Sequence, residues 1–304
     1  ADKESDIMDL FKNLEKKFGV MTKTVGKKFT YLGMNIEFKT DDSTGPLVEV
    51  TMGQYVDAVI EKWQPKSRYS TPATDRLFET DDSMPLVDAG MQRLFHTMVA
   101  KLLYLAKRAR PDILVAVSML TTRVTKATEV DVGKLDRIVG YLDTTRELGI
   151  RLAALGTSVN VYCYVDASYG VHHDLKSHTG IFISLGLGPI FAGSCKQKIV
   201  TRSSFEAEVV AVSDAGSPTV WIMDLLAELG YRIRPAILYQ DNAGAVAALK
   251  SGEAKGRNSK HIRIRRLWLN ERVRSDLIAD IESSSKDWTK LNILTCSATY
   301  STVR

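Results

Sequence analysis

The stretch VNVYCYVDASYG, from Val159 to Gly170, decides the interpretation of the second half of this 304-residue chain. Apolar residues alternate with polar or aromatic ones as far as Val165, which is the pattern of a half-buried β-strand. Asp166 follows where that strand should end. A carboxylate there loses hydration and is unfavourable without compensation. The pattern therefore predicts a specific partner for Asp166.

The sequence after about residue 150 alternates short strands with helices. Strand patterns are GIRLAAL (149–155), VNVYCYVDAS (159–168), TGIFISLG (179–186), GPIFAGSCKQ (188–197), PAILYQDN (235–242) and LIADIES (277–283). A long helical pattern starts at Ser203-Ser204 and runs past Pro218 to Leu229, and two further helices cover 244–252 and about 259–273. This order is typical of an α/β domain in which a crossover helix returns the fourth strand parallel.

The first half reads differently, as a small β-region followed by helices. The predicted elements are a helix over 6–18, a strand over 29–39, its hairpin partner over 47–52, and helices over 54–63, 91–109, 112–125 and 130–148. Residues 67–88 are polar and proline-containing, which indicates a loop. We place the domain boundary between Gly149 and Ser158, giving domains 1–150 and 151–304.

Composition narrows the class of protein. The chain is 44% hydrophobic and 25% charged, as globular proteins are. No apolar run approaches the roughly 20 residues needed to cross a bilayer, so no membrane partner is expected. Cys163, Cys195 and Cys296 are scattered and show no CxxC spacing, which argues against a disulfide framework and a zinc site. A net charge of +5 permits an acidic partner without requiring one.

Three acidic residues are candidates for one site. Asp166 and Asp241 each end an apolar strand, and the carboxyl ends of parallel neighbours meet at one edge of a sheet, where ligands bind. The third acid comes from SSFEAEVV, where Glu208 shares the helix face of Val209 and Val212. Glu206 points nearer the solvent side in that pattern and stays the alternative.

Converging carboxylates indicate a cation. Close carboxylates repel one another unless one is protonated or a cation lies between them. Oxygen ligands of this kind suit Mg²⁺ or Mn²⁺. Two such ions roughly 4 Å apart can activate a water and stabilise the leaving oxygen during phosphodiester hydrolysis.

A series of motifs extends this hypothesis. The order YVDAS, HTG, GPI, KQK, SSFEAE, YQDN and KHIRIR, over about 161–265, closely resembles the ribonuclease H domain of copia-type (Pseudoviridae) retrotransposon Pol polyproteins. In the first half YLGMNIEF, QYVDAVIEKW, STPAT, LLYLAKRARPDILVAV and IVGYLDTT resemble the thumb and connection region that follows the reverse transcriptase palm. The resemblance covers nearly the whole chain.

The resemblance implies a fold and an activity. The fold would be a five-stranded mixed sheet with helices on both faces, preceded by a smaller, mostly helical domain. The activity would be metal-dependent endonucleolysis of the RNA strand of RNA–DNA hybrids, with two Mg²⁺ or Mn²⁺ ions. By motif, Asp166, Glu208 and Asp241 correspond to catalytic, metal-binding acids of the family. The resemblance implies a location in a cytoplasmic virus-like particle or in the nucleus. The expected partners are the RNA–DNA hybrid and the palm and fingers domains of the reverse transcriptase.

The sequence also departs from the family pattern. Asn292, in LNILT, stands where the family has its fourth metal-site aspartate. Arg263 replaces an acid, Leu267 a histidine and Phe205 a threonine. A palm-type catalytic pair is missing, since Asp41-Asp42 and Asp81-Asp82 lie in turn or cap sequences. We therefore expect no DNA synthesis by this chain alone.

Basic residues suggest where a nucleic acid would bind. Lys196, Lys198 and Arg202 precede the helix of Glu208, while Lys260, His261 and Arg265 belong to a basic helix. They fit phosphate contacts, although a solvated helix face explains the second group equally well. The histidines of YGVHHDLKSHTG, at 172, 173 and 178, are expected to be exposed loop residues rather than metal ligands.

Two alternative functions stay open. One is a catalytically weakened or inactive remnant that only binds nucleic acid, which the loss of the fourth acid at Asn292 favours. The other is a transposase or integrase with the same fold and an acid triad. The motif order and the thumb-like first half argue against that second alternative.

Overall fold

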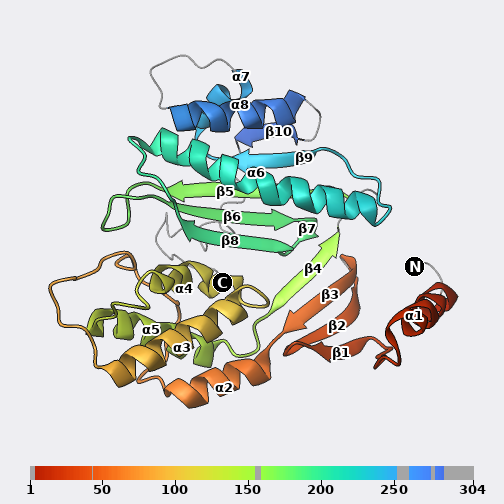
Figure 1. The fold of residues 1–304 in the computed structure, drawn as a ribbon, viewed down its shortest axis with the longest axis horizontal. Helices are drawn as coiled ribbons and strands as arrows, with labels where there is room; N and C mark the ends of the chain where they lie inside the picture. Colours follow the sequence, from red (N-terminus) through yellow and green to blue (C-terminus); the bar gives the residue numbers. More distant parts are fainter. Residues whose placement is uncertain (1–3, 43, 155–158, 252–259, 275–277, 284–304) are drawn as a thin grey trace.

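The computed structural model describes residues 4–42, 44–154, 159–251, 260–274 and 278–283. Its strands form two five-stranded sheets (Figure 1). The first sheet is formed mainly by the first half of the chain and the second by the second half, and helices fill the space beside each.

The first sheet begins with a hairpin instead of the single strand predicted over 29–39. Strands β1 (Lys28–Tyr31) and β2 (Met34–Asp41) pair antiparallel, with Tyr31 opposite Met34. Leu32 and Gly33 form the turn, with φ values of 50° and 78°. Two successive positive φ values are typical of two-residue hairpin turns, but leucine is rare in that conformation. The single-strand prediction is therefore wrong.

The rest of the first sheet contains one more departure. Strand β3 (Gly45–Thr51) pairs with β2, as predicted, but β4 (Ile150–Ala154) pairs with β3 on its other side. The two-residue β7 (Gly186–Leu187) completes the order β1-β2-β3-β4-β7. Grouping GIRLAAL with the second set of strands is thus wrong. The boundary between Gly149 and Ser158 stays a prediction, and we propose its later end because β4 belongs to the first sheet.

Helices form the core of the first part. They are α2 (Gly53–Trp63), α3 (Ala89–Ala106), the 3₁₀ turn η1 (Pro111–Ile113), α4 (Leu114–Thr121) and α5 (Glu129–Thr144), close to the predicted spans. Residues 114–120 of α4 are all buried, so this helix is central. Burial of large side chains such as Leu102, Leu120 and Leu135 is the main favourable contribution to this core.

The second sheet has the order β10-β9-β5-β6-β8. Strand β5 (Tyr162–Ser168) lies between antiparallel β6 (His178–Ser184) and parallel β9 (Ala236–Gln240), with β8 (Phe191–Lys196) and β10 (Ile278–Ser283) at the edges. The predicted mixed ribonuclease H-like sheet is confirmed. The parallel β5–β9 pair follows from the crossover through α6 (Ser204–Glu228), which separates them in the chain.

Helix α6 forms the core above this sheet. Val209 and Val212 are fully buried with Cys163 and Val165 of β5. Among the described residues it is the one helix long and apolar enough to cross a bilayer, contrary to the expectation from sequence, yet half of that stretch is buried. An apolar helix buried in this way is typical of a protein core.

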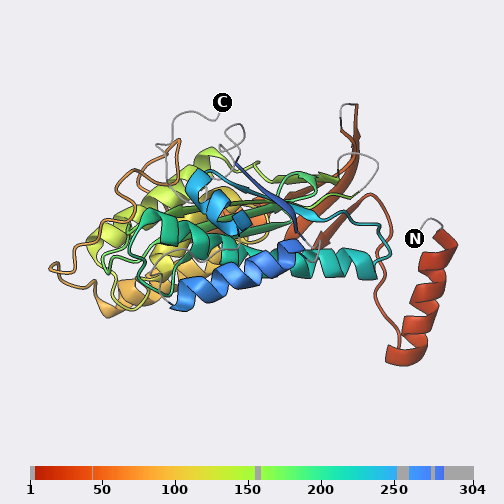
Figure 2. The same ribbon diagram turned by 90° about the horizontal axis from the view of Figure 1, so that it is seen from above.

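Two shorter helices, α7 (Ala243–Ser251) and α8 (Lys260–Arg274), pack against α6. Gly216 permits the contact with α8, because a Cβ at that position would lie 2.5 Å from the ring of Trp268. Figure 2 shows α6 and α8 on the same side of the second sheet. On the opposite face, Phe182 joins the core of the first part, against which Tyr164 and Ala192 pack.

Helix α1 (Glu4–Phe18), which the periodicity predicts, stands at one end of the molecule (Figures 1 and 2). Its apolar residues Ile7, Leu10 and Phe18 are exposed. This helix therefore contributes little to either core.

Polar and aromatic contacts join the two parts. Ser118 of α4 donates a hydrogen bond from Oγ to the carbonyl of Ser194 in β8 at 2.8 Å. Phe78, in the loop before α3, packs against the rings of His172 and His178 at centroid distances of 5.0 and 5.2 Å. The junction therefore involves the edge strand β8 and the loop before β6.

The histidines at this junction correct a prediction. His173 is exposed as expected, but His172 and His178 are buried. His172 Nε2 lies 3.1 Å from His178 Nδ1, and His178 Nε2 lies 2.7 Å from Ser194 Oγ. Burial lowers the pKa of His178 to about 3 and that of His172 to about 4. The sequence around these histidines is turn-like and predicted exposure. It could not show that Phe78, 94 positions before His172, packs against both rings.

We expect this pair to make the protein less stable in mild acid. The unfolded histidine titrates near 6.5, so below that pH the unfolded state binds more protons and stability falls as the pH approaches the lower folded value. Between pH 6.5 and 5, the titration of His178 alone should lower the free energy of unfolding by up to about 2 kcal/mol. Urea denaturation of His178→Gln should show a smaller loss than the wild type between pH 7 and 5. Equal losses would contradict the assignment.

Candidate metal centre

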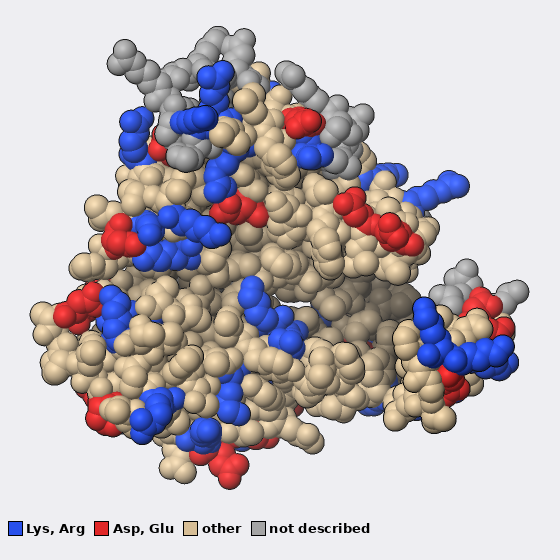
Figure 3. Space-filling model, in the orientation of Figure 1, with Lys and Arg blue, Asp and Glu red and all other residues tan. Residues whose placement is uncertain are grey.

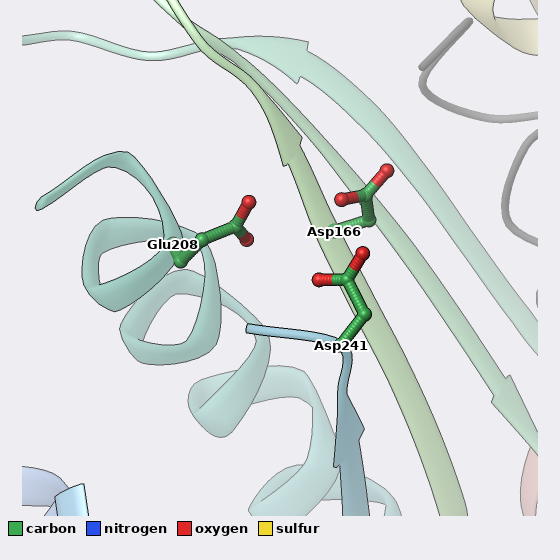
Figure 4. A group of neighbouring side chains, drawn as sticks. All are labelled: Asp166, Glu208 and Asp241. Carbon is green, nitrogen blue, oxygen red and sulfur yellow. The ribbon is translucent and has the colours of Figure 1, made fainter. Parts of the chain in front are cut away.

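Three carboxylates converge where β5 and β9 end and α6 begins (Figure 4). Asp166 lies in β5, Asp241 directly follows β9, and Glu208 projects from the second turn of α6. One carboxylate oxygen of each lies within 4.8 Å of the others. The convergence follows from topology, because parallel strands have their carboxyl ends at one edge of the sheet. The sequence predicted these three as neighbours, and their catalytic role stays a prediction.

The electrostatics of the cluster are unfavourable without a cation. Asp166 and Glu208 are each 5% exposed. Burial, with the charges of Asp166 and Asp241, raises the pKa of Glu208 to about 9. Partial burial of the Asp241 carboxyl group and the charge of Asp166 raise the pKa of Asp241 as well. At neutral pH the cluster therefore holds a proton or a cation in place of the third negative charge.

Glu206, the alternative ligand, has a different role. Ser203 caps α6 by accepting a hydrogen bond from the backbone N–H of Glu206 at 3.3 Å. The Glu206 carboxylate accepts one from the backbone N–H of Arg202 at 3.0 Å. The two bonds together satisfy backbone N–H groups at and just before the start of α6. Glu206 is buried instead of solvent-facing, which corrects the prediction for that residue.

The donor set fits a hard divalent ion. The three acids offer oxygen ligands at one edge of the sheet, as Mg²⁺ and Mn²⁺ require. A cation among them would also remove the repulsion that raises the pKa of Glu208. A two-ion site and the contribution of Asn292 stay predictions, since residue 292 lies outside the described residues.

The first group of predicted substrate-binding residues lies beside the start of α6. Gln197, between Lys196 and Lys198, connects this segment to α6. Its Nε2 donates hydrogen bonds to Thr179 Oγ1 at 3.0 Å and to the carbonyl of Ala207 in α6 at 2.9 Å. Its neighbour Lys198 is exposed, whereas Lys196 forms an ion pair with Asp174 at 2.8 Å. Arg202 is exposed and lies 3.8 Å from the Glu206 carboxylate. Lys198 and Arg202 are therefore the better placed cations of this group.

The second group lies on α8. Lys260 is exposed, and Arg265 is paired with Asp214 of α6, which gives it a structural role. For His261 only the backbone, within α8, is described. On the face of Figure 3, lysine and arginine are interspersed with acidic side chains. The structure does not gather Lys260 and Arg265 with the acidic cluster in any described contact.

The two Asp-Asp pairs have structural contacts. Asp82 is paired with Arg123 at 2.6 Å and with Lys126 at 3.1 Å, and Asp81 accepts hydrogen bonds from Ser83. Asp41 pairs with Arg151 of β4 at 3.1 Å. These contacts agree with the turn and cap roles indicated by the sequence.

One residue near the acids is absent from the predictions made from sequence. Gln240, the last residue of β9, is fully buried and donates a hydrogen bond from Nε2 to Glu208 Oε2 at 2.9 Å. Its position next to Asp241 was the only available signal.

Comparisons with known proteins show what the sequence is similar to. It is 37% identical over 195 residues to the "Retrovirus-related Pol polyprotein from transposon RE1" of Arabidopsis thaliana, covering 64% of this chain and 13% of that protein. It is 26% identical over 282 residues to the corresponding polyprotein from transposon TNT 1-94 of Nicotiana tabacum, covering 90% and 21%. The chain thus spans only a small part of these relatives. No family model matches it.

The fold has a match among solved structures. The chain aligns over 99% of its length, with a TM-score of 0.52 and 12% identity, to 36% of a foamy viral protease-reverse transcriptase, solved in complex with an RNA/DNA hybrid. At this identity the likeness concerns the fold alone.

A cation should stabilise the fold through the acidic cluster. We expect millimolar Mn²⁺ to raise the melting temperature of the wild type, since a ligand that binds only the folded state stabilises it. Asp241→Asn should abolish that rise and leave the metal-free melting temperature equal or higher, because one repelling charge is gone. Differential scanning fluorimetry measures both, and Asp224→Asn, at an exposed position of α6, is the control. A full Mn²⁺ response in Asp241→Asn would exclude Asp241 as a ligand.

Proposed function

We propose that this chain, whose homologues are retrovirus-related Pol polyproteins of copia-type transposons, hydrolyses the RNA strand of RNA–DNA hybrids in a divalent-metal-dependent reaction. The observation that carries the proposal is the convergence of Asp166, Glu208 and Asp241 on a ribonuclease H-like sheet. Supporting it, three carboxylates from three separate elements, two of them buried, are costly to fold unless they bind something.

The acids would act as the metal-holding groups. Asp166, Glu208 and Asp241 would bind Mg²⁺ or Mn²⁺, with two ions expected, and Asn292 would occupy the family's fourth position. When bound, such ions supply positive charge that stabilises the attacking and departing oxygens of a phosphodiester. Burial of Asp166 and Glu208 would strengthen their interaction with a cation.

The basic residues beside the start of α6 would hold the nucleic acid. Lys198 and Arg202 are exposed near the helix that carries Glu208, so they could contact phosphates close to the acids. Lys196 and Arg265 are weaker candidates, because they are less exposed than Arg202 and form closer ion pairs with Asp174 and Asp214 than Arg202 does with Glu206. Lys260 and His261 are weaker candidates as well, because they lie on α8 and not beside the start of α6. A hybrid is recognised by shape, backbone and the 2′-hydroxyl, so binding would show little sequence preference.

A second function is favoured by Asn292. An asparagine carbonyl can coordinate a cation but brings no negative charge to a position that is acidic in the family. The chain would then bind hybrid without efficient cleavage. DNA synthesis by this chain alone is expected from neither version, because Asp81 and Asp82 have structural partners.

A cleavage assay tests the proposal. Purified chain is incubated with hybrid labelled on the RNA strand, with Mg²⁺, Mn²⁺ or EDTA. We expect metal-dependent cleavage that falls by more than about 100-fold in Asp166→Asn, which is beyond the range for residues that only support a ligand. Asp224→Asn should cleave normally. Cleavage that persists in EDTA or in Asp166→Asn would refute the proposed mechanism.

Asn292→Asp addresses the alternative. Its activity should exceed that of the wild type if residue 292 contributes to the metal site. If the wild type and Asp166→Asn are equally silent while both bind hybrid in a salt-sensitive way, the chain is a binding protein. An unchanged rate in Asn292→Asp would exclude that residue from the site.

A further inference from the structure

Gln240 is an uncharged residue whose side chain contacts the acidic cluster directly. It ends β9, directly before Asp241, and its side chain is fully buried. A buried side-chain amide is costly unless its donors and acceptor are satisfied, so its partners indicate its role.

The amide contacts all three elements that carry an acid. Its Nε2 donates to Glu208 Oε2 of α6 at 2.9 Å and to the carbonyl of Val165 in β5 at 3.3 Å. Its Oε1 accepts a hydrogen bond from the backbone N–H of Asn242 at 3.0 Å. Val165 precedes Asp166 and Asn242 follows Asp241, so each contact lies on an acid or one residue from it.

A second hydrogen bond, made by the side chain of Asn242, also stabilises the turn after Asp241. Asn242 accepts at Oδ1 from the backbone N–H of Ala245 at 3.0 Å, which caps the start of α7. Gln240 therefore links β5, α6 and the β9–α7 turn through one planar group. A planar amide fixes the directions of its bonds, and glutamine has one χ rotation fewer than a flexible cation such as lysine.

We propose that Gln240 is the positioning residue of the metal centre, holding Glu208 and the backbone beside Asp166 and Asp241 in the arrangement that binds the cation. The role rests on the proposed function, because it presupposes that the three acids bind a metal. An amide suits it because it donates to a carboxylate without adding charge to the cluster. A cation at this position would compete with the metal, and a fourth carboxylate would increase the repulsion.

The chain offers a matched control. Gln197 is also buried in the second part, and its Nε2 also makes two hydrogen bonds, one of them to α6 at Ala207. Ala207 precedes Glu208, but neither bond of Gln197 involves a carboxylate, and neither reaches β5 or the turn after Asp241. Replacing Gln197 thus removes an equivalent buried amide and leaves the linkage among the acids intact.

The test compares Gln240→Met with Gln197→Met in the full chain. Mn²⁺ affinity is measured by isothermal titration calorimetry, and folding by the cooperativity of urea denaturation. We expect both variants to lose stability. Only Gln240→Met should bind Mn²⁺ more weakly, by about 10-fold, the lower end of the effect of residues that orient metal ligands. Unchanged Mn²⁺ affinity in a folded Gln240→Met would overturn the proposal, as would an equal loss in Gln197→Met.

A second variant keeps the test valid if Gln240→Met does not fold. Gln240→Asn keeps the amide but is one methylene too short to make all three contacts, and its affinity should fall by a similar factor. If Gln240→Asn binds Mn²⁺ with the affinity of the wild type, Gln240 is not a positioning residue. Failure of the proposed function is seen separately, as an absence of Mn²⁺ binding by the wild-type chain itself. Mn²⁺ binding without RNA cleavage would refute the hydrolase and leave the positioning role supported.

Discussion

The repulsion among three carboxylates is the constraint on which the second part of this protein depends. Burial and the neighbouring charges raise the pKa of Glu208 to about 9, so the metal-free cluster is kept together against its own electrostatics. The surrounding fold must supply the free energy that opposes this repulsion. It does so with apolar contacts between α6 and β5, where Val209, Val212 and Cys163 are fully buried.

The helix that supplies this core also carries the acid. Glu208 follows Ala207 and precedes Val209, both fully buried, so its backbone is held in place relative to β5. The capping bonds of Ser203 and Glu206 fix where α6 begins. The favourable packing of α6 therefore holds the three carboxylates close together despite their repulsion. Functional sites commonly have unfavourable local electrostatics of this kind.

Much of this arrangement could be predicted from the sequence, for a physical reason. Asp166 and Asp241 end apolar strands, and strand order with a crossover helix determines that such ends meet. The wheel position of Glu208 beside Val209 and Val212 also depends only on local periodicity. What could not be predicted depends on contacts between distant segments or on unusual backbone. Leu32 adopts a positive φ, β4 joins the first sheet, and Phe78 buries two histidines that stand in a turn-like sequence.

Gln240 is the clearest example of a residue whose contacts could not be predicted from the sequence. Its type and position suggest a strand residue that alternates between core and surface, and nothing local distinguishes it from an ordinary buried amide. Its role depends on three partners, at positions 165, 208 and 242, that only the folded topology brings together. An amide with a donor for the carboxylate and an acceptor for the following turn satisfies all three at no cost in charge. The three acids supply the oxygen ligands at this edge of the sheet. Gln240, the neutral residue among them, would determine how closely their positions match those that a cation requires.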